Sequence, residues 1–352
     1  MTEILYRIID ANYNRAREAF RVMEEYCRFG LNNPSLSGQA KRCRHQLCNA
    51  LHSISEERLL SSRDTEGDVG KELKVEGQFQ RKSLQDCFTA AAKRASEALR
   101  ALAETTQALD PVLAATMEKL RFEVYSLEKK AVLFACSKHK FESVRLYVLI
   151  NANPQKTPSE VMNLVKCCVE NGADCIQLRA KGLYDSDLLS LAKKFTTLCK
   201  DGGIVSIIND RGDIAILSGA DGVHLGQNEI SVSDARQLTK GPFIIGVSTH
   251  NLDELHNAIE SGCDYAAVGP AFRSPTKPLI DVAGPEYLQK AVPILDNAGI
   301  FHVAIGGIRS NTIPDLLQIG VRTVAVSSDI EHSADPEKTC KALKKLLLDY
   351  QK

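Results

Sequence analysis

Tryptophan is absent from this 352-residue chain, and aromatic residues make up only 6% of it. Such a shortage argues against an extended surface on which nucleic-acid bases could stack. No stretch approaches the roughly 18 uncharged apolar residues that a membrane-spanning helix requires. The first residues include Glu3 and Asp10, which a secretory signal peptide would not carry. These absences predict a protein that works without a membrane or a nucleic acid as partner.

Net charge is also lacking, because 44 Lys and Arg residues balance 44 Asp and Glu residues. This balance excludes a uniformly basic nucleic-acid binder and an acidic disordered chain. The 11 cysteines are odd in number and form no CxxC pair, which argues against a structural zinc site. Free thiols in a reducing cytosol are the simplest interpretation, so a cytoplasmic location is expected.

The chain exceeds the roughly 100–200 residues of a typical domain, and the spacing of apolar residues differs between its two halves. Residues 1–136 carry apolar residues at helical spacing, as between Ala16, Phe20 and Met23, and are predicted to be an all-α domain. The Gly- and Asp-rich segment 63–70 is predicted to be a loop within it. A polar linker is expected at 137–143.

The helical half contains an internal repeat. The pattern Arg-Ala-x-Glu-Ala-x-Arg-x-x-x-Glu begins at Arg15 and again, 79 residues later, at Arg94. Two copies predict two similar helices packed about a pseudo-twofold axis rather than a solenoid. The repeated Arg and Glu residues fit a solvated face with ion pairs along each helix, or alternatively a binding groove.

After residue 143, short apolar runs alternate with amphipathic helical patterns about every 25 residues. Strands are predicted at 144–151, 174–179, 204–209, 222–225, 243–248, 265–269, 302–306 and 323–327. Eight such units predict a (β/α)8 TIM barrel over 144–352. A doubly wound open sheet is the alternative, but no GxGxxG motif follows the first strand.

Chemistry in such a barrel lies at the carboxyl ends of its strands. The second strand ends in Gln177, Arg179 and Lys181, and strand alternation puts these three on one side. An Arg fork beside a Lys point charge suits a diphosphate. Asp210 and Glu229 follow the next two strands, and two carboxylates beside phosphate are the usual arrangement for Mg²⁺. His224 is interpreted as a packed barrel residue rather than a catalyst.

A second anion site is predicted further round the barrel. Gly307 and the pair Ser327–Ser328 follow strands seven and eight, the recurrent phosphate site of these barrels. Segment 269–277 combines Gly and Pro with hydroxyls and a lysine, as a phosphate-binding lid would. Two phosphorylated small molecules, one of them a metal-bound diphosphate, suggest substitution at carbon with diphosphate leaving.

Residues 144–350 resemble the thiamine phosphate synthases. The matching motifs run in order along the chain: Gln177–Lys181, Asn209–Asp210, Gly222–Gln227, Gly246–Ser248, Gly269–Phe272, Ser274-x-Thr276-Lys277, Gly306–Ile308 and Ser327–Ser328. The resemblance implies that 4-amino-2-methyl-5-(hydroxymethyl)pyrimidine diphosphate reacts with 4-methyl-5-(2-phosphoethyl)thiazole to give thiamine phosphate and pyrophosphate. It further implies a dissociative, Mg²⁺-assisted substitution.

The resemblance also assigns residues to each substrate. The pyrimidine diphosphate would be held by Gln177, Leu178, Arg179, Ala180, Lys181, Asn209, Ser248 and Lys277, of which Arg179, Lys181, Ser248 and Lys277 would act in catalysis. The thiazole phosphate would be held by Ser274, Pro275, Thr276, Gly307, Ser327 and Ser328. Asp210 and Glu229 would bind Mg²⁺, although Glu229 stands where the family usually has Asp.

The N-terminal half resembles a helical extension carried by a subset of these synthases, on the segments 9–18, 44–47 and 63–70. That likeness implies no activity. One interpretation is a non-catalytic module that dimerises, binds a ligand or tethers a pathway partner. The alternative is a second catalytic activity, with Arg63, Asp64 and Asp68 binding a small anion or metal. For the barrel, an isomerase acting on the thiazole phosphate alone is the competing function. Homo-oligomerisation is left open by the sequence.

Overall fold

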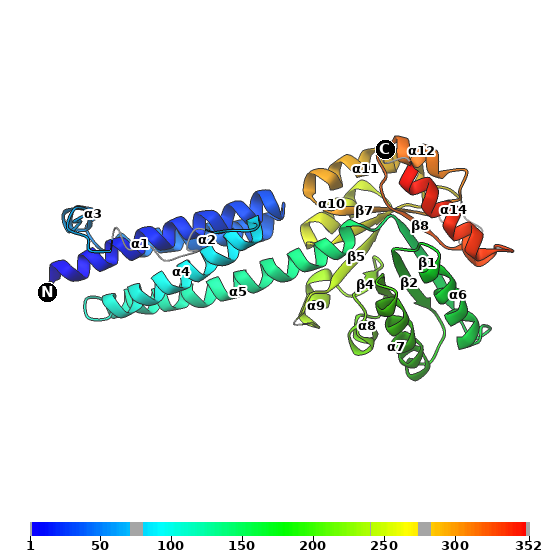
Figure 1. The fold of residues 1–352 in the computed structure, drawn as a ribbon, viewed down its shortest axis with the longest axis horizontal. Helices are drawn as coiled ribbons and strands as arrows, with labels where there is room; N and C mark the ends of the chain where they lie inside the picture. The colour runs from blue at the N-terminus through cyan, green and yellow to red at the C-terminus, as the bar shows by residue number, and fades with distance from the viewer. Residues whose placement is uncertain (1, 71–79, 240, 274–282, 350–352) are drawn as a thin grey trace. The chain divides into compact units, whose positions relative to one another are not determined.

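The computed structural model describes residues 2–70, 80–239, 241–273 and 283–349. It divides into two compact units, residues 1–132 and 133–352 (Figure 1). The first is helical and the second contains the whole sheet. The prediction of a (β/α)8 barrel preceded by a helical region is confirmed.

Among its described residues, the helical unit has helices as its only regular elements. They are α1 (Thr2–Glu25), the π-helical turn η1 (Tyr26–Gly30), α2 (Pro34–Leu51), α3 (Glu56–Ser61), α4 (Leu84–Thr106) and the first part of α5 (Pro111–Glu142). Side-chain caps begin two of them, because Asn33 accepts a hydrogen bond from the Leu36 N–H and Ser83 accepts one from the Asp86 N–H.

The two copies of the repeat lie on α1 and α4, which pack against each other and run in opposite directions (Figure 1). The repeated alanines, Ala16 with Ala19 and Ala95 with Ala98, are buried. The repeated Arg and Glu residues stay exposed and pair along each helix, at 2.8 Å for Arg21–Glu25. This arrangement is the solvated, ion-paired face rather than a groove.

The predicted linker at 137–143 is wrong, because α5 continues to Glu142. No Gly or Pro interrupts this segment, and Ser137, Lys140 and Phe141 contact the barrel. The Ser137 hydroxyl accepts a hydrogen bond from the Phe243 N–H, and the Phe141 ring stacks on that of Tyr265 with centroids 4.4 Å apart. The last turns of α5 therefore belong to the barrel unit.

The barrel unit alternates strands and helices throughout. The strands are β1 (Leu146–Ala152), β2 (Cys175–Ala180), β3 (Val205–Asn209), β4 (Gly222–Leu225), β5 (Ile244–Thr249), β6 (Tyr265–Val268), β7 (Phe301–Ile305) and β8 (Val324–Val326). The helices are α6 (Pro158–Glu170), α7 (Asp185–Asp201), α8 (Gly212–Ser218), α9 (Val232–Gln237), α10 (Leu252–Ser261), α11 (Gly284–Ala298), α12 (Ile313–Gln318), α13 (Ser328–Glu331) and α14 (Pro336–Asp349).

All eight strands are parallel and form a closed barrel in chain order, β8 pairing back to β1. The strand alternation divides the apolar residues into two cores. Residues such as Leu178 and Val223 pack outward against the helices. Tyr147, Tyr265 and Val303 fill the interior.

Large rings close the amino-terminal end of the barrel interior. Tyr147 and Tyr265 lie at or near the starts of β1 and β6, and Phe141 stacks on Tyr265 and lies tilted against Tyr147. Gly246 is paired with Tyr265 across β5 and β6. A Cβ at position 246 would lie 2.0 Å from the Tyr265 ring, so only glycine leaves room for it. This packing leaves the opposite end for polar residues.

No helix among the described residues is both long enough and apolar enough to cross a membrane.

Candidate active site

The second strand delivers its polar side chains to the barrel interior as predicted. Gln177 is buried, and its amide donates a hydrogen bond to the Tyr147 hydroxyl at 2.9 Å. Arg179 lies two residues further towards the mouth and is half-buried. Leu178 and Ala180 have the opposite orientation and pack against the outer core. Their side chains therefore do not face the interior, and only their main chain is available to a substrate.

Asn151, at the end of β1, was not predicted and connects two predicted groups. Its side-chain oxygen accepts a hydrogen bond from Arg179 Nη1 at 3.2 Å. Its Nδ2 donates to the Ser327 hydroxyl at 3.1 Å and to Glu331 Oε2 at 2.8 Å. Glu331 also forms an ion pair with Lys156. Its place at the carboxyl end of the first strand is a sequence signal for the active-site end of the barrel, but not for these partners.

Asp210 follows β3 in the left-handed backbone region, with φ of 62°. Its N–H donates to the His224 carbonyl at 2.8 Å, which ties it to the neighbouring strand β4. Its carboxylate lies 3.7 Å from Lys181 Nζ. Asn209, one residue earlier, ends β3 and is half-buried. The predicted cation and the predicted metal ligand are thus brought together.

Arg211 is directed away from that pair. It forms ion pairs with Asp185 at 2.6 Å and Asp213 at 2.7 Å. Hydrogen bonds from this guanidinium lower the pKa of both carboxyl groups. Glu229 lies in the exposed turn after β4, where its N–H contacts the Gly226 carbonyl at 3.4 Å. Among the described residues no hydrogen bond or ion pair draws its carboxylate into the barrel, so its place beside Asp210 stays a prediction.

His224 and Ser248 are linked inside the barrel. His224 is 7% exposed, and its Nε2 lies 2.9 Å from the Ser248 hydroxyl oxygen. Its Nδ1 lies 3.0 Å from the Tyr265 hydroxyl. The interpretation of His224 as a buried barrel residue is correct, but it contacts a predicted substrate ligand directly.

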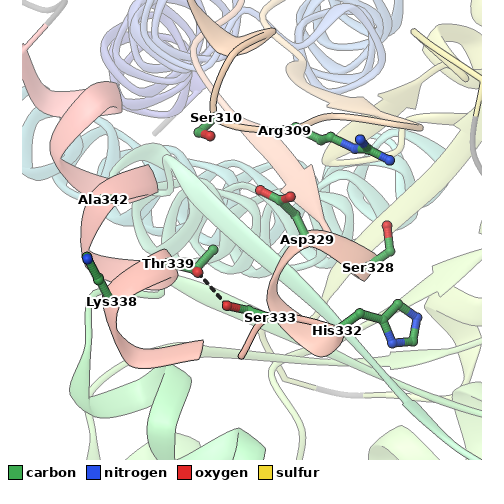
Figure 2. Close-up of a pocket in the computed structure, with 9 residues that line it drawn as sticks. All are labelled: Arg309, Ser310, Ser328, Asp329, His332, Ser333, Lys338, Thr339 and Ala342. Atoms are coloured by element: carbon green, nitrogen blue, oxygen red, sulfur yellow. Dashed lines mark hydrogen bonds between the residues drawn. The ribbon is translucent and has the colours of Figure 1, made fainter. Parts of the chain in front are cut away.

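The loops after β7 and β8 carry the residues that are predicted to hold the thiazole phosphate. Gly307 has φ of 62°, and a Cβ there would lie 2.6 Å from the Arg273 carbonyl oxygen. Ser328 lines a cavity of about 540 Å³ with Arg309, His332 and Lys338 (Figure 2), whereas Ser327 contacts Asn151. Ser274, Pro275, Thr276 and Lys277 lie outside the described residues.

In the helical unit, the loop at 63–70 is bound to α1. Arg63 forms a two-pronged ion pair with Asp10, at 2.6 and 2.9 Å. Arg7 donates to the Asp64 carbonyl at 2.9 Å, and the Asp64 carboxylate accepts a hydrogen bond from the Gly67 N–H at 2.7 Å. Two of the three residues considered for an anion or metal site, Arg63 and Asp64, are therefore engaged in holding this loop, and the Asp68 carboxylate accepts a hydrogen bond from the Gly70 N–H at 2.9 Å.

A closed eight-stranded parallel barrel with cations and a carboxylate gathered at the carboxyl ends of its strands is the architecture of a (β/α)8-barrel enzyme. Residues 146–330 match the family model for thiamine monophosphate synthase. Residues 7–130 match the model for the ThiD2 family.

Named relatives agree with the first match. A thiamine-phosphate synthase of Nostoc punctiforme is 38% identical over 336 residues, covering 95% of this chain and 92% of the relative. One from Rhodopirellula baltica is 34% identical over 348 residues, covering 97% and 92%. The structure of thiamine phosphate pyrophosphorylase from Pyrococcus furiosus matches with a TM-score of 0.53 at 28% identity, over 61% of this chain and 99% of that one. The chain belongs to the thiamine-phosphate synthase family, a family of transferases in thiamine biosynthesis, as the motifs predicted.

Proposed function

We propose that this barrel joins the pyrimidine diphosphate to the thiazole phosphate by dissociative substitution, releasing pyrophosphate. The observation that carries the proposal is the Asn151 bridge. Its side chain contacts Arg179, a predicted diphosphate ligand, and Ser327, a predicted thiazole phosphate ligand. Two anion sites that share one hydrogen-bonding side chain can hold two substrates close enough to react.

In this proposal the bond between the pyrimidine methylene carbon and the diphosphate oxygen breaks first, and its electron pair leaves with the diphosphate. The thiazole nitrogen then gives its lone pair to the methylene carbon and forms the new C–N bond. Arg179 and Lys181 act by offsetting the charge that develops on the leaving diphosphate. Ser248 donates a hydrogen bond to the same group. The chain's work is positioning and charge stabilisation, with no covalent intermediate on the protein.

The residues available fit Mg²⁺. Among the residues described, no group of three or more His, Cys, Asp or Glu side chains could form a metal cage. Mg²⁺ does not need one, because it usually takes one or two carboxylates and completes its shell with water and substrate phosphate. Asp210 beside Lys181 offers a hard oxygen ligand at the predicted diphosphate position, and Glu229 would supply the second carboxylate. When bound, Mg²⁺ would neutralise charge on the leaving diphosphate.

The test is product formation by the purified chain with both substrates and Mg²⁺. We expect thiamine phosphate and pyrophosphate in equal amounts. Metal-independent conversion of the thiazole phosphate alone would instead support the isomerase. We expect Asp210→Asn to raise the Mg²⁺ concentration for half-maximal rate by more than about tenfold, because a neutral amide is a poorer ligand. Asp187→Asn, an exposed carboxylate in the first turn of α7, is the matched control.

We further propose that the chain works in the cytoplasm. All 11 cysteines are free thiols, and most are buried. Burial raises the pKa of the Cys27 and Cys263 thiols to about 12, which keeps them protonated and unreactive. A chain with so many unpaired thiols suits a reducing compartment.

A further inference from the structure

A continuous chain of hydrogen bonds crosses the barrel interior and ends at Ser248. Gln177 Nε2 contacts the Tyr147 hydroxyl at 2.9 Å, and that hydroxyl contacts the Tyr265 hydroxyl at 2.9 Å. Tyr265 contacts His224 Nδ1 at 3.0 Å, and His224 Nε2 contacts Ser248 Oγ at 2.9 Å. The five residues come from five different strands, so this series of hydrogen bonds depends on the closed barrel.

These groups are removed from water. Tyr265 is fully buried, and Tyr147 and Gln177 are each 2% exposed. Burial raises the pKa of both tyrosines well above 10, so each hydroxyl keeps its proton and can donate one hydrogen bond. A buried donor without an acceptor would be costly, so the protons are expected to adopt the arrangement in which each has an acceptor.

That requirement fixes which group donates and which accepts at each step of this series of hydrogen bonds. The Gln177 amide nitrogen can only donate, so the Tyr147 oxygen accepts there. If Tyr265 also donated to Tyr147, the Tyr147 proton would have no acceptor that the structure records among the described residues. With Tyr147 donating to Tyr265, the Tyr265 proton goes to His224 Nδ1.

The direction continues to the end of the chain. Because His224 Nδ1 accepts from Tyr265, a neutral His224 carries its proton on Nε2 and donates it to Ser248. The Ser248 oxygen is then an acceptor towards the interior, and its own proton points elsewhere. Ser248 stands at the carboxyl end of β5, on the side of the barrel where substrate is expected.

We propose that Tyr147, Tyr265 and His224 are positioning residues that hold His224 as the Nε2–H tautomer and thereby turn the Ser248 hydroxyl into a hydrogen-bond donor to the leaving diphosphate. The inference rests on the proposed function of Ser248. It gives a role to the Phe141 ring as well, since that ring stacks on Tyr265 and fixes the middle of the chain.

The first test is independent of turnover. In ¹⁵N-labelled protein, long-range ¹H–¹⁵N correlation reports which ring nitrogen of each histidine carries the proton, and His224→Gln identifies the resonance of His224. We expect His224 to be the Nε2–H tautomer in the unaltered protein and a mixture of tautomers in the Tyr265→Phe variant. An Nδ1–H tautomer in the unaltered protein would overturn the proposal, whether or not the chain makes thiamine phosphate.

The second test is a double-mutant cycle on the synthase rate. We expect Tyr265→Phe to lower kcat about tenfold when Ser248 is present, and less than about twofold in the Ser248→Ala background, because its effect passes through that hydroxyl. The KM for the thiazole phosphate should stay within about twofold. An equal loss in both backgrounds would mean that Tyr265 is only structural and would contradict the inference.

Two matched comparisons complete the experiment. His224→Gln places an N–H near the position of Nε2, whereas His224→Asn places one near Nδ1, so we expect the glutamine variant to be the faster by about tenfold. Tyr287→Phe removes a hydroxyl that donates to the Asn251 carbonyl and takes no part in this series of hydrogen bonds. It should leave kcat unchanged. A faster asparagine variant would overturn the proposal. Absence of product from the unaltered protein would count against the proposed function instead.

Discussion

The guanidinium of Arg179 donates a hydrogen bond to the side-chain oxygen of Asn151 across 3.2 Å. The Asn151 amide can do two things at once, because its oxygen accepts from an arginine while its nitrogen donates to Ser327 and Glu331. Neither a carboxylate nor an alanine offers both. Asn151 therefore fixes the Arg179 fork relative to the loop after β8.

We expect Asn151→Ala to lower kcat/KM for the pyrimidine diphosphate about 10- to 100-fold, because the Arg179 fork loses its fixed orientation. The KM for the thiazole phosphate should also rise, since Ser327 loses its donor. Steady-state kinetics with each substrate varied in turn measure both. Asn171→Ala, which removes a hydrogen bond to the Cys167 carbonyl at the end of α6, should leave both parameters unchanged. A loss confined to one substrate would contradict the bridge.

The barrel site was predictable because alternation and strand order follow from short apolar runs. Knowing that Gln177 and Arg179 share one side of a strand is enough to place both inside a closed barrel. Asn151 was missed because a single asparagine after a strand carries no chemistry until its neighbours are known. The Tyr147–Tyr265 contact joins residues 118 apart in the chain, and no local pattern records such a pairing.

The end of α5 shows a second limit. Ser137, Lys138, His139 and Lys140 give the segment a polar composition that is typical of a linker. The segment is helical despite that composition, because Phe141 stacks on the Tyr265 ring and Lys140 forms an ion pair with Asp221 at 2.7 Å. Tertiary contacts, rather than local propensity, therefore decide where the helix ends.

We expect Phe141→Ala to destabilise the barrel unit by about 3–5 kcal/mol, because it removes a fully buried ring and leaves a cavity beneath Tyr265. Chemical denaturation followed by circular dichroism measures the change. Phe122→Ala on the same helix is the control, since Phe122 is 57% exposed and should cost far less. Equal losses for the two variants would mean that Phe141 does not form part of the barrel core.

The repeat in the helical unit predicts that substituting its buried alanines costs more stability than substituting its exposed charged residues. Ala16→Leu should destabilise the unit by about 1–3 kcal/mol, because Ala16 is fully buried in a helix that packs closely on α4. Arg21→Ala breaks only the exposed pair with Glu25 and should cost less than about 1 kcal/mol. Urea denaturation compares them, and a larger effect of Arg21→Ala would revive the binding-groove interpretation.

His302 predicts a pH dependence of stability. It is 4% exposed on β7, and burial lowers its pKa below 6.5 despite the opposing attraction of Asp296, whose carboxylate lies 3.3 Å from Nδ1. Arg322 and Arg145 repel the charged form as well. The Arg322 N–H donates to Nε2 at 3.0 Å, a bond that requires this nitrogen to be unprotonated.

The sign follows from the two pKa values. Since the folded-state pKa is depressed, the unfolded chain takes up a proton first as the pH falls, and the folded state loses stability. His302 thus contributes stability that is complete above about pH 6.5 and is lost as the pH falls through the folded-state pKa, by up to about 1.4 kcal/mol per pH unit. His302→Gln keeps an acceptor for the Arg322 N–H but cannot be protonated. Its free energy of unfolding, measured in urea at about pH 7.5 and about pH 5.5, should therefore fall less than that of the unaltered chain. The control is His139→Gln, at a side chain that is 89% exposed, whose free energy of unfolding should fall by as much as that of the unaltered protein. An equal fall in His302→Gln would show that His302 does not set the pH dependence of stability.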